Sequence, residues 1–428
     1  MTRRLLVTVA AAAFALAVAA PALATQPFNL NFQNFPLDAS GTTRDGTVLY
    51  NGTSLQLASS GLHSMDYTDL HANYAGDGVS GSGPYEYGTW TSGLTTLAFP
   101  FDELVSSWNA QTPQGTWIQV EMKPTLDDGH VAKWYVLGQW TYGDSDFHRT
   151  SVGGQGDGDG FVSIDTWFAH SHPARSYRLR VTLFRRAGTT ATPTFDRLSV
   201  IASKLTNQRG TFPSRSDMNG EVDLGVPGYS QELHHHEFEQ FDGGGEAWCS
   251  PTSTSMVVQY WDNRYPGNGY APSAAEMYWV PYAEPWVDYT ARYVFDYHYN
   301  GAGNWPFNTA YAAGRGLVGD VTMLHNLREA EPFIHAGIPL VASVAWQPNK
   351  LDGSDIKSTN GHLVVIEGFT ADGSQVIVND PATVPGNPVK HYYDRAQFER
   401  AWIPASGGVV YVIRPPGYPT PDLTQNNS

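Results

Sequence analysis

The chain of 428 residues contains one cysteine, Cys249. A single cysteine cannot form a disulfide within its own chain, so a fold stapled by disulfides is excluded. It is either a buried, inert side chain or a thiol retained for its reactivity. The sequence after the first 24 residues also lacks any run approaching ~20 apolar residues, so no membrane-spanning helix is expected.

Basic residues are scarce. The chain has 25 Lys and Arg against 41 Asp and Glu, which gives a formal net charge of −16. This excess of negative charge argues against a nucleic-acid partner or an anionic membrane surface. Aromatic residues, in contrast, make up 13% of the chain, a high fraction that is typical of β-rich, ligand-facing proteins.

The N-terminus has the pattern of an export signal. Arg3 and Arg4 provide positive charge, residues 5–20 are apolar, and Ala22-Leu23-Ala24 forms a small-residue cleavage site. We therefore predict that residues 1–24 are a secretory signal peptide and that the protein is secreted and extracellular. A membrane anchor is the alternative, but the apolar run is short.

Residues 25–204 are predicted to form an all-β sandwich or jelly roll. Apolar and polar residues alternate in 116–122 and in 177–183, and a period of two indicates half-buried antiparallel strands. Residues 133–140 and 198–202 are predicted as further strands. Gly-, Asp- and Ser-rich turns separate these segments, as in sandwiches and barrels.

A polar, aperiodic segment at 205–222 is predicted to be a linker between two domains. The second domain, residues 223–415, combines a helical stretch after Cys249 with apolar strand-like runs near its end, which indicates an α+β fold. The proline-rich residues 416–428 are predicted to be a disordered tail.

Cys249 is predicted to begin a buried helix. Three glycines at 243–245 permit an irregular backbone before it, and Pro251 suits the first turn of a helix. Residues 252–261 then place Met256 and Tyr260 on one helical face. The free N–H groups and the dipole at a helix N-terminus favour a thiolate.

His362 is predicted to be the base and Asp380 the group that orients it. His362 begins an apolar strand, and a turn with Asp-Gly near its centre leads to a return strand that ends near Asp380. If Phe369 pairs with Gln375, then Asp380 lies two residues from the position opposite His362, on the same face. The two side chains can then meet diagonally, whereas a slip of one residue would separate them.

A thiol acyl-transfer site also needs hydrogen-bond donors for the oxyanion that develops on the substrate. We assign this role to Gln231 together with the backbone N–H of Cys249. Gln240 is closer to Cys249 in the sequence and remains an alternative.

Five segments resemble a known family when taken in order. The chain is similar to the bacteriocin-processing (double-glycine) cysteine peptidases, specifically to their stand-alone secreted relatives, through residues 226–231, 248–253, 337–341, 361–368 and 378–381. The resemblance implies a papain-like fold, with Cys249 as nucleophile, His362 as base, Asp380 as orienting acid and Gln231 as oxyanion donor.

The resemblance covers about 190 of the 428 residues and says nothing about the first domain. The chain departs from the family pattern in two places. Ser250 follows the cysteine where the family usually has glycine, and Gln231 precedes Cys249 by 18 positions, across an acidic, His-rich insertion.

Three other patterns favour structural interpretations. Three consecutive histidines, His234 to His236, suggest a metal site, but adjacent side chains cannot all face one ion, so a solvated run is predicted. Residues 157–160 match half a calcium loop and lack its later Glu, so a turn is predicted. The serines after Cys249 lack the elbow motif of serine hydrolases.

The dense aromatic residues between 278 and 305 are expected to be divided between the core and a substrate groove.

The sequence thus predicts a secreted cysteine peptidase that cleaves peptide or protein substrates through a thioester acyl-enzyme and requires no cofactor. A cell-wall peptide amidase or an acyl transferase on the same site is one alternative. A non-catalytic binding protein is another, and the N-terminal domain is a candidate carbohydrate-binding module that contacts polysaccharide.

Overall fold

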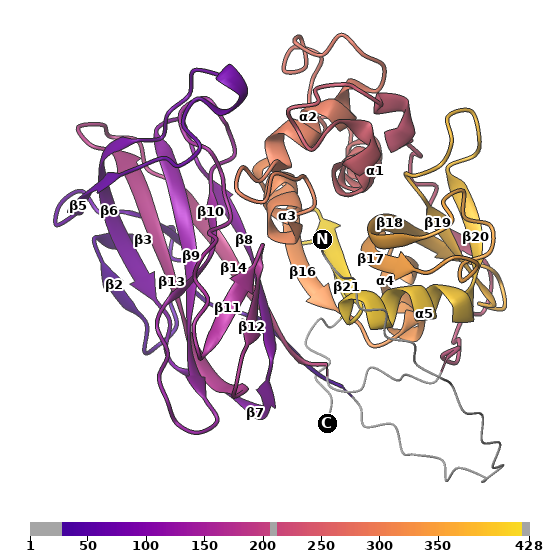
Figure 1. Cartoon of the computed structure of the whole chain (residues 1–428), viewed down its shortest axis with the longest axis horizontal. Helices are drawn as coiled ribbons and strands as arrows, with labels where there is room; N and C mark the ends of the chain where they lie inside the picture. Colours follow the sequence, from indigo (N-terminus) through magenta and orange to yellow (C-terminus); the bar gives the residue numbers. More distant parts are fainter. Residues whose placement is uncertain (1–27, 206–211, 422–428) are drawn as a thin grey trace, which may run out of the picture.

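The computed structural model describes residues 28–205 and 212–421 (Figure 1). The predicted signal peptide, residues 1–24, lies outside the described residues. So do residues 206–211 of the predicted linker and residues 422–428 of the predicted tail. None of the helices in the described ranges is long and apolar enough to span a membrane.

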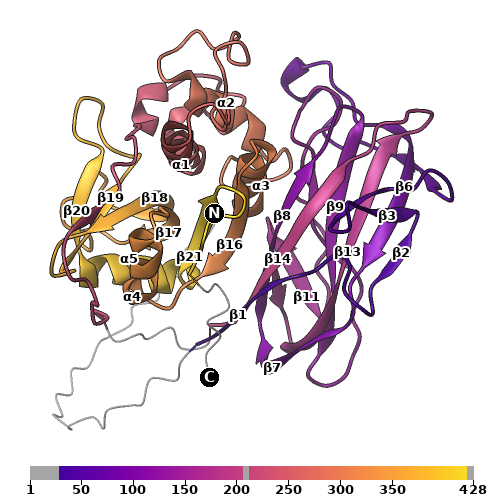
Figure 2. The same ribbon diagram turned by 180° about the vertical axis from the view of Figure 1, so that it is seen from behind.

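Residues 28–204, the N-terminal region, form two antiparallel seven-stranded sheets (Figures 1 and 2). One sheet has the order β11-β12-β8-β14-β4-β3, with β1 paired to β14. Its strands are β1 (Asn29–Asn34), β3 (Thr47–Tyr50), β4 (Ser54–Leu57), β8 (Glu103–Gln111), β11 (Gly160–Ser163), β12 (Thr166–Ala169) and β14 (Thr194–Lys204).

The other sheet of this region has the order β10-β9-β13-β6-β2, with β5 paired to β6 and β7 to β13. Its strands are β2 (Thr43–Asp45), β5 (His63–Tyr67), β6 (Gly83–Thr91), β7 (Thr95–Phe101), β9 (Thr116–Leu126), β10 (Tyr135–Trp140) and β13 (Ala174–Arg186). Within residues 28–204 the only helical element is the short 3-10 turn η1 (Tyr74–Gly76). The prediction of a β-rich N-terminal part is confirmed.

Three of the four predicted strands fall within β9, β13 and β14, and the predicted strand 133–140 begins two residues before β10. β9 is more buried than the alternating pattern predicts, because aromatic side chains also cover the outer face of its sheet. Trp117 of β9 stacks between Phe184 and Phe147, with ring centroids 3.7 and 4.4 Å apart. The sheet therefore has an apolar layer on both faces, which an alternating pattern alone does not predict.

Residues 222–414, the C-terminal region, contain a third antiparallel sheet of seven strands with the order β16-β21-β17-β18-β19-β20 and β15 paired to β18. Five α-helices accompany it, so the α+β prediction for this region is confirmed. The strands are β15 (Val222–Asp223), β16 (Val318–Met323), β17 (Leu340–Trp346), β18 (Thr359–Phe369), β19 (Gln375–Asn379), β20 (Lys390–Asp394) and β21 (Val409–Arg414).

The helices lie on both sides of this sheet (Figure 1). α1 contacts α2, α3 and β18, whereas α5 packs on β17. Met256 and Tyr260 of α1 are both buried, as the helical spacing predicted. The helices are α1 (Cys249–Arg264), α2 (Pro285–Val294), α3 (Trp305–Gly314), α4 (Leu327–His335) and α5 (Arg395–Ser406), and the 3-10 turns are η2 (Gln231–His234) and η3 (Gly245–Ala247).

The two regions meet where α3 and β16 pack against β8 and β14 (Figures 1 and 2). Buried Asp320 of β16 accepts hydrogen bonds from the guanidinium of Arg197 on β14 at 2.8 and 3.1 Å. Arg414 of β21 donates to the same carboxylate at 2.9 Å. Burial alone would raise the pKa of Asp320, but the two guanidinium groups outweigh it and lower that pKa. A buried, ionised carboxylate thus joins the regions.

One part of the predicted disordered tail is ordered. The ring of Tyr418 packs edge-on against Trp261 of α1, with centroids 4.9 Å apart. Its hydroxyl donates a hydrogen bond to the carbonyl of Ala336 at 2.8 Å. The described residues 416–421 form neither a helix nor a strand, but one aromatic side chain is sufficient to dock this segment.

Candidate active site

Cys249 is the first residue of α1, where the sequence predicted a helix start. The preceding loop packs tightly on η2: a Cβ atom at Gly245 would lie 2.2 Å from the carbonyl oxygen of Gln231. Gly244 has a φ of 98°, which glycine adopts without strain. The glycines therefore let the chain turn sharply into the helix, and they leave Cys249 partly exposed at a cleft.

His362 on β18 and Asp380 directly after β19 meet as side chains. The distance from Nε2 of His362 to Oδ1 of Asp380 is 2.7 Å, and both side chains are buried. The specific pair Phe369–Gln375 used to predict this contact is wrong, because Phe369 pairs with Val376.

A β-bulge accounts for this difference. Between Ile366 and Gly368 the register of the β18–β19 ladder shifts by one residue, so Ile366 pairs with Val378 and Val365 with Asn379. These pairs have the register that the sequence analysis assumed. The end of the hairpin near His362 is therefore aligned as predicted, although its turn end is not.

The electrostatics of the pair follow from its burial. Burial alone would lower the pKa of His362, but the charge and hydrogen bond of Asp380, together with Cys249, raise that pKa to about 10. Burial alone would raise the pKa of Asp380, yet His362 and the other donors lower it. Because Nε2 is engaged by Asp380, Nδ1 is the ring nitrogen that remains for the thiol.

Two further residues fix the carboxylate of Asp380, and no pattern in the sequence indicated either of them. The hydroxyl of Tyr393 on β20 donates to Oδ2 at 2.7 Å, and the backbone N–H of Ala382 donates to Oδ1 at 3.0 Å. The ring of Trp346 also lies edge-on to His362, with centroids 5.9 Å apart. The aromatic run in residues 392–393 is a signal for a buried strand, but it gives no information about its partner.

Gln231 lies at the cleft beside Cys249, whereas Gln240 is not among the residues that line it. The backbone N–H of Gln231 donates to the carbonyl of Pro381 at 2.8 Å, directly after Asp380. Its Nε2 atom donates to the carbonyl of Glu246 at 2.7 Å. An amide Nε2 carries two hydrogens, so one N–H of Gln231 remains available. The side chain of Gln240 is exposed.

Ser250, which replaces the family's usual glycine, is buried and bonded. Its hydroxyl lies 2.9 Å from the hydroxyl of Tyr411 on β21. The substitution therefore adds a satisfied contact between α1 and the sheet. Ser253 is also buried and donates to the carbonyl of Leu363 at 3.0 Å.

The cleft has a volume of about 600 Å³ and is built by both regions. The hairpin between β11 and β12 contributes one wall through Ser163, Ile164 and Asp165. The backbone N–H of Trp305, the first residue of α3, donates to Oδ2 of Asp165 at 2.8 Å and holds this hairpin in place. Ile164 has a φ of 58°, an unfavourable conformation for a β-branched residue.

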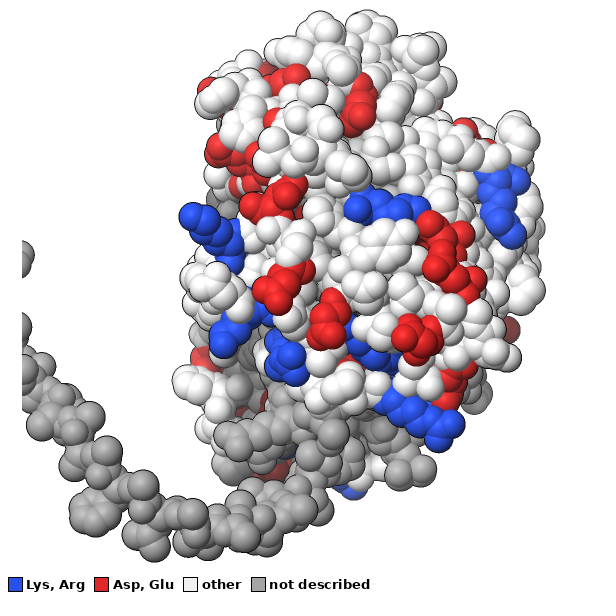
Figure 3. Space-filling view, turned by 90° about the vertical axis from the view of Figure 1, so that its right-hand side faces the viewer, with Lys and Arg blue, Asp and Glu red and all other residues white. Residues whose placement is uncertain are grey.

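The cleft is acidic. Four carboxylates line it, and none of its described lining residues is Lys or Arg; the acids are Asp165, Glu232, Asp242 and Glu246. Burial raises the pKa of Asp165 to about 7 and that of Asp242 to about 6. Acidic and basic side chains are interspersed on the outer face of the C-terminal region (Figure 3). The cleft therefore differs in charge pattern from that surface.

The predicted division of the aromatic residues between core and groove is partly visible. Tyr299 and Trp305 line the cleft, Tyr289 and Tyr297 are buried, and Tyr278 is 85% exposed.

The predicted turn at residues 157–160 is present: Oδ1 of Asp157 accepts hydrogen bonds from the backbone N–H groups of Asp159 and Gly160.

The histidine run differs from the prediction. His235 and His236 are exposed, as expected for a solvated run, but His234 is completely buried. The prediction was wrong for His234 because its neighbours include Asp288 of α2, which is far away in the sequence. Sequence spacing within the run cannot reveal such a partner.

Comparison with known proteins places these observations in a family. Residues 34–203 match the family described as "Peptidase C39 N-terminal domain", and residues 223–410 match the "Peptidase_C39 like family". No curated protein sequence matches the chain. The matches to these two families support a cysteine peptidase in general terms. The chain is a relative of the C39 peptidases, which confirms the resemblance drawn from its motifs.

Two solved structures are similar to part of the chain at low identity. A C39-like peptidase from Bacillus anthracis is 16% identical, with a TM-score of 0.29 over 46% of this chain and 98% of its own. Xylellain, a cysteine protease from Xylella fastidiosa, is 10% identical, with a TM-score of 0.27 over 46% of this chain and 87% of its own.

Proposed function

We propose that the protein hydrolyses peptide bonds with Cys249 as nucleophile, His362 as base and Asp380 as the orienting acid. The single observation that carries the proposal is that Cys249 and His362 line one cleft while Asp380 is bonded to His362. Cys249 is one of the groups that raise the pKa of His362, and Nε2 of His362 lies 2.7 Å from Oδ1 of Asp380. We propose in the same way that the C-terminal region is papain-like. α1, which begins with Cys249, packs on β18, which carries His362.

The reaction follows from this geometry. His362 accepts the thiol proton, and the Cys249 thiolate attacks the substrate carbonyl, forming a C–S bond. The imidazolium returns its proton to the departing amine as the C–N bond breaks, which leaves a thioester. Water then attacks the thioester while His362 takes a water proton, and the thiolate leaves as the carboxylic acid is released. No cofactor takes part in these steps.

The oxyanion of each tetrahedral intermediate would lie near the start of α1. The free Nε2 hydrogen of Gln231 and the backbone N–H of Cys249 are the donors we assign to it. The N–H groups of the first helical turn have no acceptor within the helix, so they are free to bond to a ligand. The backbone N–H of Gln231 donates to the carbonyl of Pro381, the residue after Asp380. This hydrogen bond fixes the position of the proposed oxyanion donor relative to the His362–Asp380 pair.

We further propose that the substrate is a cationic peptide or protein. Four carboxylates around the cleft attract Lys and Arg side chains or a free N-terminal amine. The hairpin of the N-terminal region forms one wall, so this region would contribute to substrate selection. Polysaccharide contact through this region is a separate hypothesis, tested by binding of residues 25–204 to polysaccharides.

We propose in addition that the protein is secreted and that residues 1–24 are removed on export. N-terminal sequencing of the protein recovered from culture medium tests this. A mature chain that begins near residue 25 supports the proposal, and a protein that remains in the cell with residue 1 intact contradicts it.

The enzymatic proposal is tested with Cys249→Ala and His362→Ala on a peptide library, with His335→Ala as a control because His335 is exposed at the end of α4. We expect both site variants to lose turnover while remaining folded, and the control to keep it. Turnover of cell-wall stem peptides in preference to polypeptides would select the amidase alternative, and transfer to an added amine would select the transferase. Failure of iodoacetamide to label Cys249 would favour a non-catalytic protein.

A further inference from the structure

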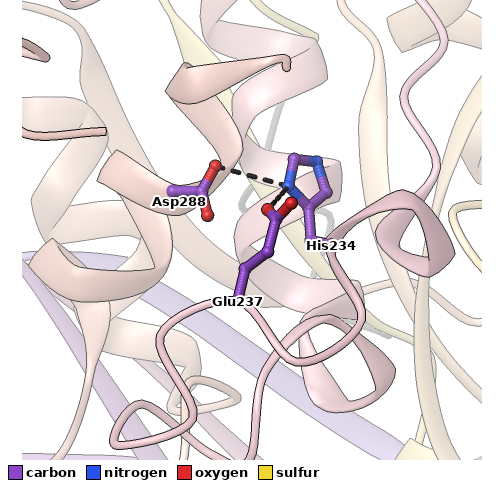
Figure 4. A group of neighbouring side chains, drawn as sticks. All are labelled: His234, Glu237 and Asp288. Atoms are coloured by element: carbon purple, nitrogen blue, oxygen red, sulfur yellow. Dashed lines mark hydrogen bonds and ion pairs between the residues drawn. The ribbon is translucent and has the colours of Figure 1, made fainter. Parts of the chain in front are cut away.

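A second group of convergent side chains includes a residue of η2, the turn that also carries the cleft residue Gln231. His234 ends η2, Glu237 follows it in the same loop, and Asp288 comes from α2 (Figure 4). Nδ1 of His234 lies 2.7 Å from Oε2 of Glu237 and 3.3 Å from Oδ2 of Asp288. One ligand atom from each residue lies within 4.8 Å of the others. Figure 4 shows that the two carboxylates approach the same ring nitrogen from different elements.

Several polar atoms of this group are buried without a hydrogen-bond partner in the described structure. They are both carboxylate oxygens of Asp288, Nε2 of His234 and Oε2 of Glu284. Asp288 and His234 are completely buried. Unpaired buried polar atoms are costly, and a native structure rarely retains several of them together. Their convergence therefore points to a ligand.

The charge of the group favours a cation. Glu237, Asp288 and Glu284 bring three carboxylates to one imidazole. No Lys or Arg of the described ranges forms an ion pair with any of these three carboxylates. Even a protonated His234 leaves negative charge in excess, and buried charge of one sign is unfavourable unless it is paired or coordinates a metal.

We propose that His234, Glu237 and Asp288 bind one divalent transition-metal ion of the zinc type. Zinc accepts imidazole nitrogen and carboxylate oxygen together, whereas Ca²⁺ takes six to eight oxygen ligands. At tetrahedral angles, two atoms that each lie ~2.1 Å from zinc are about 3.4 Å apart. The separation of Nδ1 from Asp288 Oδ2 already matches this, and Glu237, which is partly exposed, has only to withdraw slightly.

The remaining carboxylate supports this assignment. If Nδ1 of His234 binds the ion, its proton must lie on Nε2, which is the nitrogen that faces Glu284. Oε2 of Glu284 lies 3.9 Å from that nitrogen. A histidine that binds a metal usually donates its other N–H to a carboxylate, which fixes the orientation of the ring. Glu284 therefore occupies the orienting position, and a water molecule would complete the coordination of the ion.

The site has a structural consequence. It would join the loop after Gln231 to α2, because Gln231 and His234 belong to the same 3-10 turn. The long insertion between Gln231 and Cys249, which departs from the family pattern, would then be fixed by the ion. The inference concerns binding and stability and does not depend on the proposed peptidase activity.

The test uses the untagged full chain in a Cys249→Ser background, so that the thiol cannot bind the metal. Zn²⁺, Mn²⁺ and Ca²⁺ are each titrated by calorimetry, and bound metal is counted by elemental analysis. We expect one Zn²⁺ per chain, loss of that binding in Asp288→Asn and Glu237→Gln, and zinc affinity weakened about 10–100-fold in Glu284→Gln. A chelator should lower the melting temperature of the parent chain and leave that of Asp288→Asn unchanged.

Glu239→Gln is the matched control. His236 and Glu239 form a pair with the same spacing as His234 and Glu237, at 3.0 Å, but both are exposed. This variant should keep zinc binding. The competing occupant is a proton on His234: although burial lowers the pKa of His234, its carboxylate neighbours raise it to about 10. Two results would overturn the proposal in favour of a proton on His234. One is the absence of stoichiometric zinc; the other is equal zinc affinity in the parent, Glu237→Gln and Asp288→Asn.

Discussion

Nε2 of His362 lies 2.7 Å from Oδ1 of Asp380, although a β-bulge and a hairpin turn separate the two residues along the chain. Because both side chains are buried, their attraction is little weakened by water, and the pKa of His362 rises to about 10. The protonated pair stabilises the fold fully below the ordinary histidine pKa, about 6.5. That stabilisation is lost as the pH rises through about 10.

The first prediction concerns Asp380→Asn. Without the carboxylate, burial lowers the pKa of His362 and only Cys249 opposes it. The alkaline limb of kcat/KM against pH, which reports the free enzyme, should therefore move from near pH 10 to lower pH. We expect kcat at neutral pH to fall by about 10²–10⁴-fold, the range associated with general acid–base groups. Peptide hydrolysis measured between about pH 5 and 11 checks the shift of the alkaline limb and the loss of kcat at neutral pH.

Asp38→Asn, at an exposed position of the N-terminal region, is the control and should leave the profile unchanged. If Asp380→Asn keeps the wild-type alkaline limb, then Asp380 does not set the protonation of His362. The orienting role would then have to be withdrawn.

The second prediction concerns Tyr393→Phe. The Tyr393 hydroxyl donates to Oδ2 of Asp380 at 2.7 Å and is one of the groups that lower the pKa of Asp380. A hydrogen bond to a charged group contributes about 1.5–3 kcal/mol. We expect kcat/KM to fall about 10-fold and the pKa of Asp380 to rise, which shifts the acidic limb of the pH profile upward.

Tyr392→Phe is a matched control, because the neighbouring Tyr392 is 48% exposed on the same strand. It should not change the pH profile. Equal profiles for the two variants would show that the Tyr393 hydroxyl does not position Asp380.

The sequence predicted those parts of the site that depend on local order. Glycines before Cys249 and a proline after it indicate a helix start, because both restrict the backbone locally. The hairpin that joins His362 to Asp380 is also local, and its apolar strands and turn residues predicted the contact. The bulge near Glu367 was not predictable, because no pattern in the strand marks the residue that leaves the ladder.

Contacts between distant segments could not be predicted from one sequence. Tyr393 reaches Asp380 only because β20 pairs with β19, and a strand pattern does not specify its neighbour. His234 is buried because α2 supplies Asp288. The hairpin at Ile164 lines the cleft because the N-terminal region packs against the C-terminal region. The apolar pattern within either region does not predict this packing. Side-chain patterns encode which face is buried and not what covers it.

The third prediction concerns the contact between the two regions. Asp320→Asn removes the charge that pairs with Arg197 and Arg414 and leaves two guanidinium groups unpaired at a buried interface. Breaking a buried pair in this way costs about 3–5 kcal/mol. We expect the free energy of unfolding in urea to fall by about that amount. Asp66→Asn, at an exposed residue of β5, should change it by less than about 0.5 kcal/mol. A loss as small as that of the control would mean that Asp320 does not stabilise the interface.

The fourth prediction concerns the acidic cleft and is tested with the double variant Glu232→Gln/Glu246→Gln. Because both carboxylates line the cleft, their removal should lower kcat/KM for peptides with Lys or Arg near the cleaved bond by about 3–10-fold. The kcat/KM for neutral peptides should change little. The measurement is therefore the ratio of kcat/KM for basic peptides to kcat/KM for neutral peptides. Raising the salt concentration should reduce the same ratio in the unmodified protein, since exposed charges are screened.

The pH dependence of this ratio follows from the other two acids of the cleft. Asp165, with a pKa of about 7, and Asp242, with a pKa of about 6, become charged as the pH rises through these values. The preference for basic peptides should therefore increase between about pH 5 and 8. Glu239→Gln, in the same loop but not among the cleft residues, is the control for the double variant. A ratio that responds equally to the control and the double variant, or that stays constant across this pH range, would show that the cleft carboxylates do not select the substrate.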